Sequence, residues 1–456
     1  MTASSTRTSR ADPYATAVAE LTRRGRFGIS LGLERIGAIL AELDHPERAL
    51  HGALVGGTNG KGSVVAMVSA VLQAAGLRVG TMPKPHLVAY RERIAVDGVP
   101  IPEADFATAI NRVLPAVDRV AARLGPPTEF EVLTAAAFGE LVRRRVDLAV
   151  VEVGMGGRLD ATNVLDPGVA AVTNVQKDHE KFLGSTLAAI GTEKAAIIKP
   201  GSLAVTGATG RGLAPVVDRC ARLAVPLRLA GPHRPYRARL RQAGWQGIVV
   251  DAVTPAGELP ELGVGLLGGH QAQNAAVALA VLDALRQDGE RRGHPLHRLD
   301  EGAVRRGLAA ARWPGRLELL PETPFGPILL DGAHNPAGAW ALARALEELD
   351  VEDVPMVIGA SRGKRITAML RALAACHPRP VFTAIEEGRA MPAAALLAAW
   401  QRAALGRGAE AAPDVAAALE RAAELRRRPG QPLVVAGSLY LVGAVRGIVA
   451  GEEAAA

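Results

Sequence analysis

The sequence predicts an α/β protein with a larger N-terminal domain built on a parallel sheet and a smaller, doubly wound C-terminal domain. Three observations carry this prediction. Apolar strand-like runs alternate with helix-like runs, a glycine-rich loop follows an early apolar run, and the alternation starts again after Trp313-Pro314-Gly315. Continuous apolar strands separated by helices are typical of parallel sheets that are covered on both faces.

The predicted elements of the first half follow this alternation. Strands are expected at residues 54–55, 147–153, 169–175 and 203–205, and helices at residues 64–75, 130–143, 186–198 and 271–285. Residues 225–268 are richer in Pro, Gly and Arg and predict a small antiparallel excursion. At the start of the chain, residues 1–26 are polar and predict a short extension followed by an exposed helix.

The second half repeats the pattern on a smaller scale and predicts a Rossmann-like domain. Its strands are expected at residues 328–330, 354–358, 381–383 and 433–435, and its helices at residues 337–348, 366–375, 393–404 and 415–426. Residues 307–316 are the expected hinge, which divides the chain into domains at 1–311 and 312–456. The alanine-rich tail at 452–456 is expected to be disordered.

The composition excludes several classes of protein. Hydrophobic residues make up 49% of the 456 residues and aromatic residues only 3%, which predicts two or three domains with cores of Ala, Val and Leu. No apolar run is long enough to span a membrane, and the N-terminus lacks a signal-peptide core. Because Cys220 and Cys376 are also far apart, we expect a cytoplasmic protein with no membrane partner and no disulfide framework.

The net charge of +7 raises the question of nucleic-acid binding. Arginine clusters such as 143–145 and 426–428 stand at the ends of predicted helices, and aromatic residues do not interleave with them. We therefore expect solvated helix ends and no nucleic-acid partner, with a modest attraction for a polyanionic small substrate.

A glycine-rich loop, Gly57-Thr58-Asn59-Gly60-Lys61-Gly62-Ser63, lies between an apolar run and a predicted helix. In such loops backbone N–H groups approach phosphate oxygens, the helix N-terminus favours negative charge, and a lysine adds a cation. The loop departs from the eight-residue phosphate-loop pattern, because Val55 takes its first position and Gly62 separates Lys61 from Ser63. It predicts a P-loop ATPase-like phosphate site, with an ordinary strand–helix turn as the alternative.

Polar residues follow two further predicted strands, at the edge where parallel sheets bind ligands. Glu152 ends one strand, where it either completes a Mg²⁺ site with Ser63 or pairs with an arginine. Asp178 and His179 follow the next strand and are metal or phosphate candidates, although a lone histidine is usually structural. Lys194 lies late in a predicted helix, where a solvated helix-end lysine is the simplest interpretation.

The second half of the chain adds candidates on its own strand ends. The amides of Gln271 and Asn274 lie one helical turn apart and either read a base edge or cap the helix. The stretch Asp331-Gly332-Ala333-His334-Asn335-Pro336 follows a buried strand, and Arg316 opens the second domain. These loops predict a site in the cleft between the domains, which is compatible with a helix cap at Asn335.

Taken together, these segments resemble the Mur ligase superfamily and, within it, the folylpolyglutamate synthase/dihydrofolate synthase family. The matching segments run along nearly the whole chain and are 31–35, 57–63, 85–87, 92–94, 127–134, 152–163, 178–179, 193–195, 313–316, 331–336 and 437–443. Each is weak alone, but their shared order is highly specific.

The resemblance implies an ATP-dependent ligase that adds L-glutamate to dihydropteroate, to a reduced folate, or to both, the bifunctional enzyme being the central expectation. ATP would phosphorylate a substrate carboxylate, and the amino group of L-glutamate would attack the acyl phosphate, releasing ADP and phosphate. Direct attack on the carboxylate fails because the anion repels nucleophiles and oxide is not a leaving group. The protein would neutralise charge and align the reactants.

The resemblance also implies the roles of the site residues. The catalytic residues would be Lys61, His179, Lys194, Arg316 and His334. ATP would be held by Thr58, Asn59, Gly60, Lys61, Gly62, Ser63, Asn274, Arg316, Asp331 and His334. One Mg²⁺ would bind Ser63 and Glu152, a second would bind His179 and Lys194, and K⁺ is a further expected cation. The pterin side would be lined by Pro85, His86 and Phe130 and covered by a mobile loop at 82–93.

A cationic lysine beside a metal ion is electrostatically unfavourable. The family's solution is carbamylation by CO₂, which converts the amine into an anion, and we predict this modification at Lys194. Arg316 and His334 would reach the phosphates only when the domains close, which would couple closure to chemistry.

Several positions depart from the family's pattern. Lys84 stands where serine is common, Gln176-Lys177 replaces a small or apolar pair, and Ala196 replaces a glycine. Lys84 and Lys177 are therefore expected to affect pterin-side recognition or contacts with additional glutamates.

The sequence leaves the choice of acceptor open, because the two synthase reactions differ only in which carboxylate reacts. A Mur ligase for a nucleotide-linked cell-wall peptide is disfavoured, since the phosphate loop begins too early in the chain to follow a UDP-binding domain. A nucleotide-binding protein without catalysis is disfavoured because the expected catalytic and metal residues are all present. Family members are commonly monomeric, and we expect a monomer.

Overall fold

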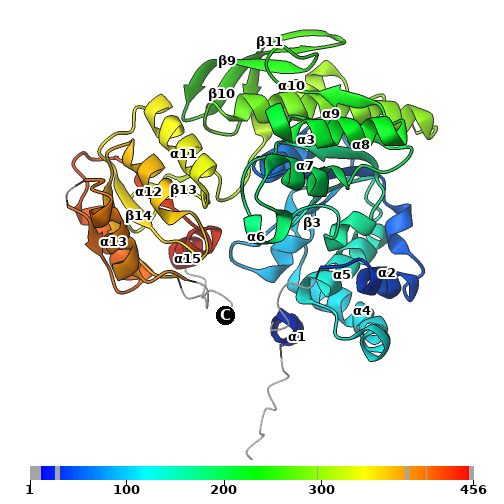
Figure 1. The fold of residues 1–456 in the computed structure, drawn as a ribbon, viewed down its shortest axis with the longest axis horizontal. Helices are drawn as coiled ribbons and strands as arrows, with labels where there is room; N and C mark the ends of the chain where they lie inside the picture. The colour runs from blue at the N-terminus through cyan, green and yellow to red at the C-terminus, as the bar shows by residue number, and fades with distance from the viewer. Residues whose placement is uncertain (1–11, 26–30, 295, 386–389, 407, 451–456) are drawn as a thin grey trace, which may run out of the picture.

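Three sheets organise the computed structural model, which describes residues 12–25, 31–294, 296–385, 390–406 and 408–450. An eight-stranded and a three-stranded sheet, with their helices, form what we call the N-terminal lobe. A six-stranded sheet with its helices forms the C-terminal lobe. Figure 1 shows the two lobes beside each other, the C-terminal lobe in yellow to red. The predicted α/β class with a larger and a smaller parallel-sheet unit is confirmed.

The eight-stranded sheet has the order β4-β3-β2-β5-β1-β6-β7-β8. Its strands are β1 (Gly52–Gly56), β2 (Val79–Met82), β3 (Ala95–Val96), β4 (Val99–Pro100), β5 (Leu148–Glu152), β6 (Gly168–Val172), β7 (Leu203–Thr206) and β8 (Leu227–Leu229). All neighbours are parallel except at the edge, where β3 pairs antiparallel with β2 and β4. Because β1 lies between β5 and β6, the loops that follow these three strands meet at one edge.

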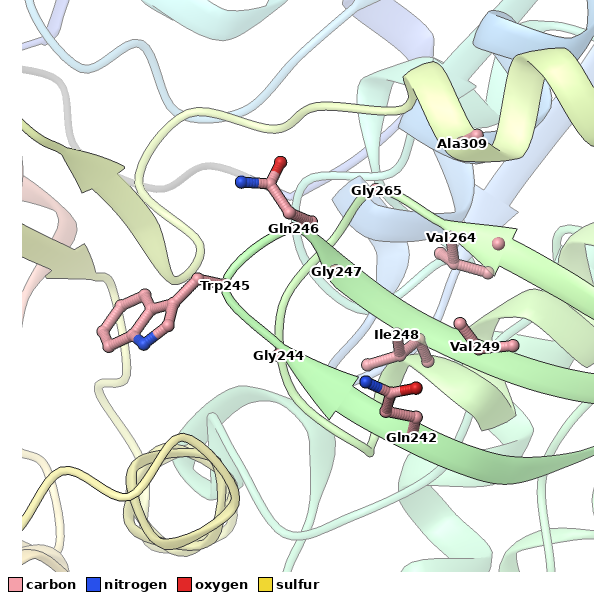
Figure 2. Close-up of a pocket in the computed structure, with 11 residues that line it drawn as sticks. Gln242, Gly244, Trp245, Gln246, Gly247, Ile248, Val249, Val264, Gly265 and Ala309 are labelled. Carbon is pink, nitrogen blue, oxygen red and sulfur yellow. The ribbon is translucent and has the colours of Figure 1, made fainter.

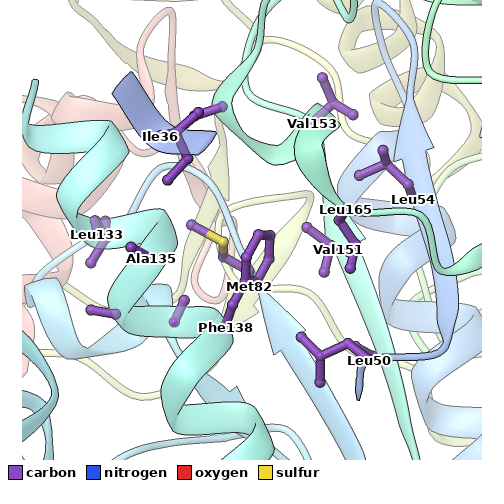
Figure 3. Close-up of a cluster of buried hydrophobic side chains, with 14 of the residues drawn as sticks. Ile36, Leu50, Leu54, Met82, Leu133, Ala135, Phe138, Val151, Val153 and Leu165 are labelled. Atoms are coloured by element: carbon purple, nitrogen blue, oxygen red, sulfur yellow. The ribbon is translucent and has the colours of Figure 1, made fainter. Parts of the chain in front are cut away.

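Successive side chains of β1 enter opposite cores, as expected for a strand covered on both faces. Leu54 packs into one core with α1 (Pro13–Gly25), α2 (Glu34–Ala41), α4 (Glu103–Leu124) and α5 (Glu129–Arg143). Figure 3 shows part of this core, with side chains from α2, α5, β1, β2 and β5 pointing into the same space. Ala53 and Val55 pack into the other core, with α3 (Lys61–Ala74), α9 (Gln271–Arg291) and α10 (Glu301–Ala310).

The predicted antiparallel excursion is confirmed as the three-stranded sheet of β9 (Arg237–Gly244), β10 (Gly247–Thr254) and β11 (Gly257–Val264). Buried side chains on one face of this sheet join the core of α9 and α10. The short or peripheral elements of the lobe are η1 (Pro46–Ala49), η2 (Tyr90–Arg93), η3 (Ala161–Val164), η4 (Gly210–Gly212), α6 (Glu180–Leu183), α7 (Leu187–Ala195) and α8 (Ala214–Leu223).

The six-stranded sheet of the C-terminal lobe has the order β12-β13-β17-β14-β15-β16 and is parallel except for β12. Its strands are β12 (Glu318–Leu320), β13 (Ile328–Asp331), β14 (Pro355–Ile358), β15 (Arg379–Phe382), β16 (Glu410–Ala411) and β17 (Leu433–Ala436). One face is covered by α11 (Pro336–Glu348), α12 (Ile366–Ala374) and α13 (Ala393–Arg402), and the other by α14 (Val415–Glu424) and α15 (Leu439–Ala450). Helices on both faces make the lobe doubly wound.

Two expectations about helices and connections were wrong. The N-terminal helix α1 is not simply exposed, because Tyr14, Val18 and Leu21 are buried against the core of α4 and α5. The predicted hinge at 307–316 begins too early, since residues up to Ala310 belong to α10 and pack on α3. The predicted tail at 452–456 lies outside the described residues. None of the helices in the described ranges is long and apolar enough to cross a lipid bilayer.

Candidate active site in the cleft between the lobes

The glycine-rich loop leaves β1 and enters α3, as predicted. In the sheet, Val55 is level with Glu152 of β5, and Gly56 is level with Val172 of β6. The C-terminal ends of the strands β5 and β6 therefore flank the loop on both sides. This placement brings together candidates that are about 90 to 120 residues apart in the sequence.

The segment that follows β6 anchors the loop through polar groups that the sequence prediction missed. Asn174 accepts a hydrogen bond from the Asn59 N–H at 3.0 Å and donates to the Asn59 carbonyl at 3.0 Å. The Thr173 hydroxyl donates to the same carbonyl at 2.7 Å. Gln176 binds the side chains of Thr58 and Asn59. Residues 173–175 were expected to continue the strand, but their polar groups instead fix the loop.

Lys61, Ser63 and Glu152 lie at the start of α3 and the end of β5. The Lys61 ammonium donates to the carbonyls of Gly57 and Thr58 at 3.4 and 3.3 Å and lies 3.8 Å from Glu152 Oε1. Ser63 and Glu152 are buried, and Glu152 Oε2 has no hydrogen-bond partner in the described ranges of the chain. Burial raises the pKa of Glu152, opposed by the charges of Lys61 and Arg316.

A carboxylate oxygen and a serine hydroxyl are ligand types that suit a hard cation such as Mg²⁺, which takes oxygen ligands and keeps several waters. Within the described residues, no group of three or more His, Cys, Asp or Glu side chains is arranged to hold a metal ion. Ser63 and Glu152 stay the predicted ligands of this cation.

The glycines of the loop allow close contact with side chains from two other segments. A Cβ at Gly60 would lie 2.3 Å from Asn274 Oδ1, and a Cβ at Gly62 would lie 2.6 Å from the Trp313 indole. Asn274 also donates to Gln271 at 2.8 Å, so the two amides share one face of α9 as predicted. The loop is thus in contact with the helix and the hinge that lead into the C-terminal lobe.

Gly62→Ala is expected to weaken nucleotide binding by about 1–3 kcal/mol, the usual cost of overpacking a tight contact. The rigid indole of Trp313 leaves no space for a methyl group, so the loop must shift. Titration with a non-hydrolysable ATP analogue measures the loss. Gly139→Ala is the matched control, because a Cβ at Gly139 meets nothing within 4 Å. Equal affinities for wild type and Gly62→Ala would contradict this packing argument.

Lys194 is buried, with a relative exposure of 3%, and its ammonium donates to the Gly57 carbonyl at 2.9 Å. The interpretation as a solvated helix-end lysine was therefore wrong. Burial and the nearby charge of Lys61 lower the pKa of Lys194 to about 7. Burial therefore favours the neutral amine over the ammonium.

His179 and Asp178 lie beyond β6, with His179 in the left-handed region at φ 51°. Burial lowers the pKa of His179 to about 4, although the Asp178 carboxylate opposes the change. Such backbone conformations cost energy for a residue other than glycine and often occur at functional sites. The His179 side chain is 42% exposed at the edge of the cleft.

Asp178 joins the two lobes. Its carboxylate accepts hydrogen bonds from Lys364 Nζ at 3.0 Å and Asn335 Nδ2 at 3.1 Å, and His334 Nε2 lies 3.6 Å away. Asn335 Nδ2 also donates to Asn59 Oδ1 of the phosphate loop at 3.1 Å. We call these five residues the interlobe cluster. The pKa of Asp178 is lowered, because its bond to His334 and the neighbouring positive charges outweigh the effect of burial.

Asn335 caps a helix and also reaches across the cleft, two functions that the sequence analysis found compatible. Its Oδ1 caps α11 by accepting a hydrogen bond from the Gly338 N–H at 2.8 Å, while its Nδ2 reaches across the cleft. Asp331 holds the loop in shape, with its oxygens accepting from the N–H groups of Leu317 and Ala333. Arg316 lies nearby, and its charge acts on both Asp331 and Glu152.

The segment that contains Pro85 and His86 bridges the lobes. The Glu92 carboxylate accepts hydrogen bonds from three successive N–H groups at residues 87–89. His86 Nδ1 accepts from Arg93 Nε at 2.9 Å, and burial together with Arg93 lowers the pKa of His86 to about 3. Leu87 packs against α15, where a Cβ at Gly443 would meet the Leu87 carbonyl. The predicted substrate loop therefore contacts the C-terminal lobe.

Phe130 lies at the start of α5. The Lys84 ammonium lies over the Phe130 ring, 3.5 Å from the ring centroid. Lys84 also lies 3.8 Å from Asp160 Oδ1. Burial lowers the pKa of Lys84 to about 8, with the charge of Asp160 opposing the change. The structure therefore brings Lys84, Phe130 and the Glu152 end of β5 to one side of the phosphate loop.

A separate cavity of about 340 Å³ lies against the β9–β10 hairpin, between Gln242, Ile248, Val264 and Ala309. In Figure 2 the indole of Trp245 extends from the hairpin turn, away from the other labelled side chains. None of the predicted site residues is among the described residues that line this cavity. The chemistry-bearing residues instead gather in the cleft.

Comparison with known proteins agrees with this geometry. The family model of the Mur ligase middle domain matches residues 55–282, and that of the dihydrofolate synthetase C-terminal domain matches residues 322–448. A Bacillus subtilis dihydrofolate synthase/folylpolyglutamate synthase is 35% identical over 77% of this chain and 80% of its own length. The folylpolyglutamate synthase of Lacticaseibacillus casei is 34% identical over 92% of this chain and 94% of its own length.

Two solved structures extend the similarity to the fold. Mycobacterium tuberculosis folylpolyglutamate synthase complexed with ADP and AMPPCP has a TM-score of 0.86 and 33% identity, covering 97% of this chain and 100% of that chain. Escherichia coli FolC in complex with DHPP and ADP has a TM-score of 0.83 and 29% identity, and the match covers 97% of this chain and 98% of that chain. With the phosphate loop and the two lobes in the family's order, the chain belongs to the folylpolyglutamate synthase/dihydrofolate synthase family of Mur-type ATP-dependent ligases.

Proposed function

We propose that this protein is an ATP-dependent ligase that joins L-glutamate to dihydropteroate, to a reduced folate, or to both. The observation that supports it best is the convergence of the phosphate loop, Glu152 and Lys194 beneath the interlobe cluster. Relatives named for both reactions strengthen the bifunctional assignment. The division at 311/312 would separate the ATP-binding domain from the glutamate ligase domain.

The chemistry requires two steps. A carboxylate oxygen of the acceptor attacks the γ-phosphorus of ATP, the bond to the β-phosphate oxygen breaks, and ADP leaves. The amine of L-glutamate then attacks the acyl carbon, loses a proton, and phosphate departs with its oxygen as the amide forms. Lys61 and the N–H groups of residues 58–63 would hold the β- and γ-phosphates. Arg316 and His334 would complete the charge neutralisation from the C-terminal lobe, with Asn274 and Asp331 holding the nucleotide.

Ser63 and Glu152 would bind one Mg²⁺, and His179 with a modified Lys194 would bind a second; K⁺ is proposed as an additional cation. A bound Mg²⁺ neutralises phosphate charge and orients the phosphoryl group. The unpartnered Glu152 Oε2 supports the first position. On the acceptor side, Pro85, His86 and Phe130 would contact the pterin. We further propose a cytoplasmic monomer.

We expect Lys194 to carry a carbamate. The neutral amine nitrogen would attack the carbon of CO₂ and lose a proton, which replaces a buried cation by an anion suited to a metal. Native mass spectrometry of the intact protein should show the mass of one CO₂ that disappears on acidification and in Lys194→Met. Lys199→Met, which removes another lysine with little exposure, is the control and should keep the added mass of CO₂. Absence of this mass, with activity independent of bicarbonate, would contradict the modification.

The function is tested by ADP release with Mg-ATP, L-glutamate and either 7,8-dihydropteroate or a tetrahydrofolate, with product masses read in each reaction. One glutamate added to dihydropteroate identifies dihydrofolate synthesis, and further glutamates on the folate identify polyglutamylation. A protein that binds ATP but uses neither acceptor would overturn the assignment.

A further inference from the structure

Lys84 is a buried ammonium without a hydrogen-bond acceptor. Its side chain is 7% exposed, and Nζ has no hydrogen-bond partner in the part of the chain that the structure describes. The nearest charge is Asp160 Oδ1, at 3.8 Å, and the Phe130 ring lies on another side at 3.5 Å from its centroid. An ammonium carries three donors, and leaving them unsatisfied away from water is costly.

Asp160 holds Lys84 electrostatically but does not satisfy its protons. Asp160 Oδ1 accepts hydrogen bonds from the Thr162 N–H and hydroxyl, and Oδ2 accepts from the Met155 N–H at 2.9 Å. The carboxylate is therefore committed to the loop that follows β5. Its charge fixes the position of the ammonium, whose donors remain available to another group.

The position of Lys84 in the sheet places this ammonium on the acceptor side of the phosphate site. The strand β2 ends at Met82, level with Val151 of β5, so Lys84 lies just beyond the sheet edge beside Glu152. The positive charge of Lys84 also acts on the Glu152 carboxylate and opposes the rise of its pKa on burial. In the proposed reaction the acceptor carboxylate would approach the γ-phosphate from this side.

We propose that Lys84 is a specificity-determining residue that binds the acceptor carboxylate that becomes phosphorylated. The inference rests on the proposed ligase function. A carboxylate supplies oxygen acceptors and the opposite charge, which makes it the strongest complement for an unpartnered ammonium. The Phe130 face beside Nζ would at the same time contact the aromatic part of the acceptor.

The test compares two ligands and two forms of the protein by calorimetric titration, with a non-hydrolysable ATP analogue present. The ligands are 7,8-dihydropteroate and the same pterin carrying aniline in place of aminobenzoate, which lacks the carboxylate. Lys84→Met should bind dihydropteroate at least about tenfold more weakly than wild type, corresponding to one lost charged hydrogen bond. Its affinity for the aniline compound should equal that of wild type. Exposed Lys181→Met is the matched control and should bind both ligands as wild type does.

The remaining outcomes overturn the inference in distinguishable ways. An equal loss of affinity for both ligands in Lys84→Met would place Lys84 against the heterocycle. No loss of affinity for either ligand would show that Lys84 does not bind the acceptor. Both outcomes leave the ligase proposal intact. A wild-type protein that binds neither ligand would overturn the inference and exclude dihydropteroate as the acceptor, while the ligase proposal itself is decided by the reaction with a tetrahydrofolate. Lys84→Ser provides the same comparison should the methionine variant not fold, because serine is common at this position in the family.

Discussion

Glu152→Gln is expected to reduce kcat/KM for glutamate addition by about a thousandfold, since losing one electrostatic stabiliser of a transition state costs about 2.7–4 kcal/mol. Glutamine keeps the size and shape of the side chain, so the end of β5 should remain folded. What it removes is the negative charge beside Lys61, including the oxygen that has no hydrogen-bond partner among the residues that the structure describes.

Steady-state assays at varied Mg²⁺ separate this effect from a general loss of structure. Glu152→Gln should need more Mg²⁺ for half-maximal activity and should unfold at nearly the same temperature as wild type. Glu258→Gln, on the exposed face of β11, is the control for a carboxylate outside the cleft. Unchanged Mg²⁺ dependence with full activity would contradict the assignment of Glu152 as a metal ligand.

Asp178→Asn is expected to lower kcat/KM by about a hundredfold and to loosen the contact between the lobes, because removing one partner of a desolvated charge pair costs about 2–5 kcal/mol. The side chain of Asp178 is 10% exposed and that of Lys364 is 20% exposed, so the lysine would lose its partner in a poorly solvated place. His334 and Asn335 would lose the same carboxylate. The phosphate loop would then be less firmly connected to the C-terminal lobe.

Small-angle scattering and kinetics together test the role of the interlobe cluster. The variant should have a larger radius of gyration than wild type without nucleotide. Lys181→Met is the control, because Lys181 is an exposed lysine of the N-terminal lobe, in α6. A variant with the scattering curve and the rate of wild type would show that Asp178 does not hold the lobes together.

Local sequence patterns were sufficient for the elements whose signals are local. The glycine loop, the apolar strand β5 and the capped start of α11 carry their own turn and helix signals, and the structure places them as predicted. The same reasoning failed for Lys194. A late helical position suggests exposure, whereas the packing of α7 against the phosphate loop buries the ammonium beneath Gly57.

Contacts between distant segments could not be predicted from spacing alone. Thr173 and Asn174 extend an apolar run, and only the β1–β6 register shows that they anchor Asn59. The pairing of Lys364 with Asp178 joins residues of different lobes, and no local pattern marks it. The buried face of α1 was missed because polar residues surround its few apolar positions.

In the proposed reaction the acceptor carboxylate is activated by direct transfer of the γ-phosphoryl group in the cleft between the lobes. Acceptor labelled with oxygen-18 in its reacting carboxylate tests this claim most directly, with mass analysis of the products after complete turnover. We expect one labelled oxygen in the inorganic phosphate for each amide formed. Label found in AMP, or phosphate released without label, would contradict it.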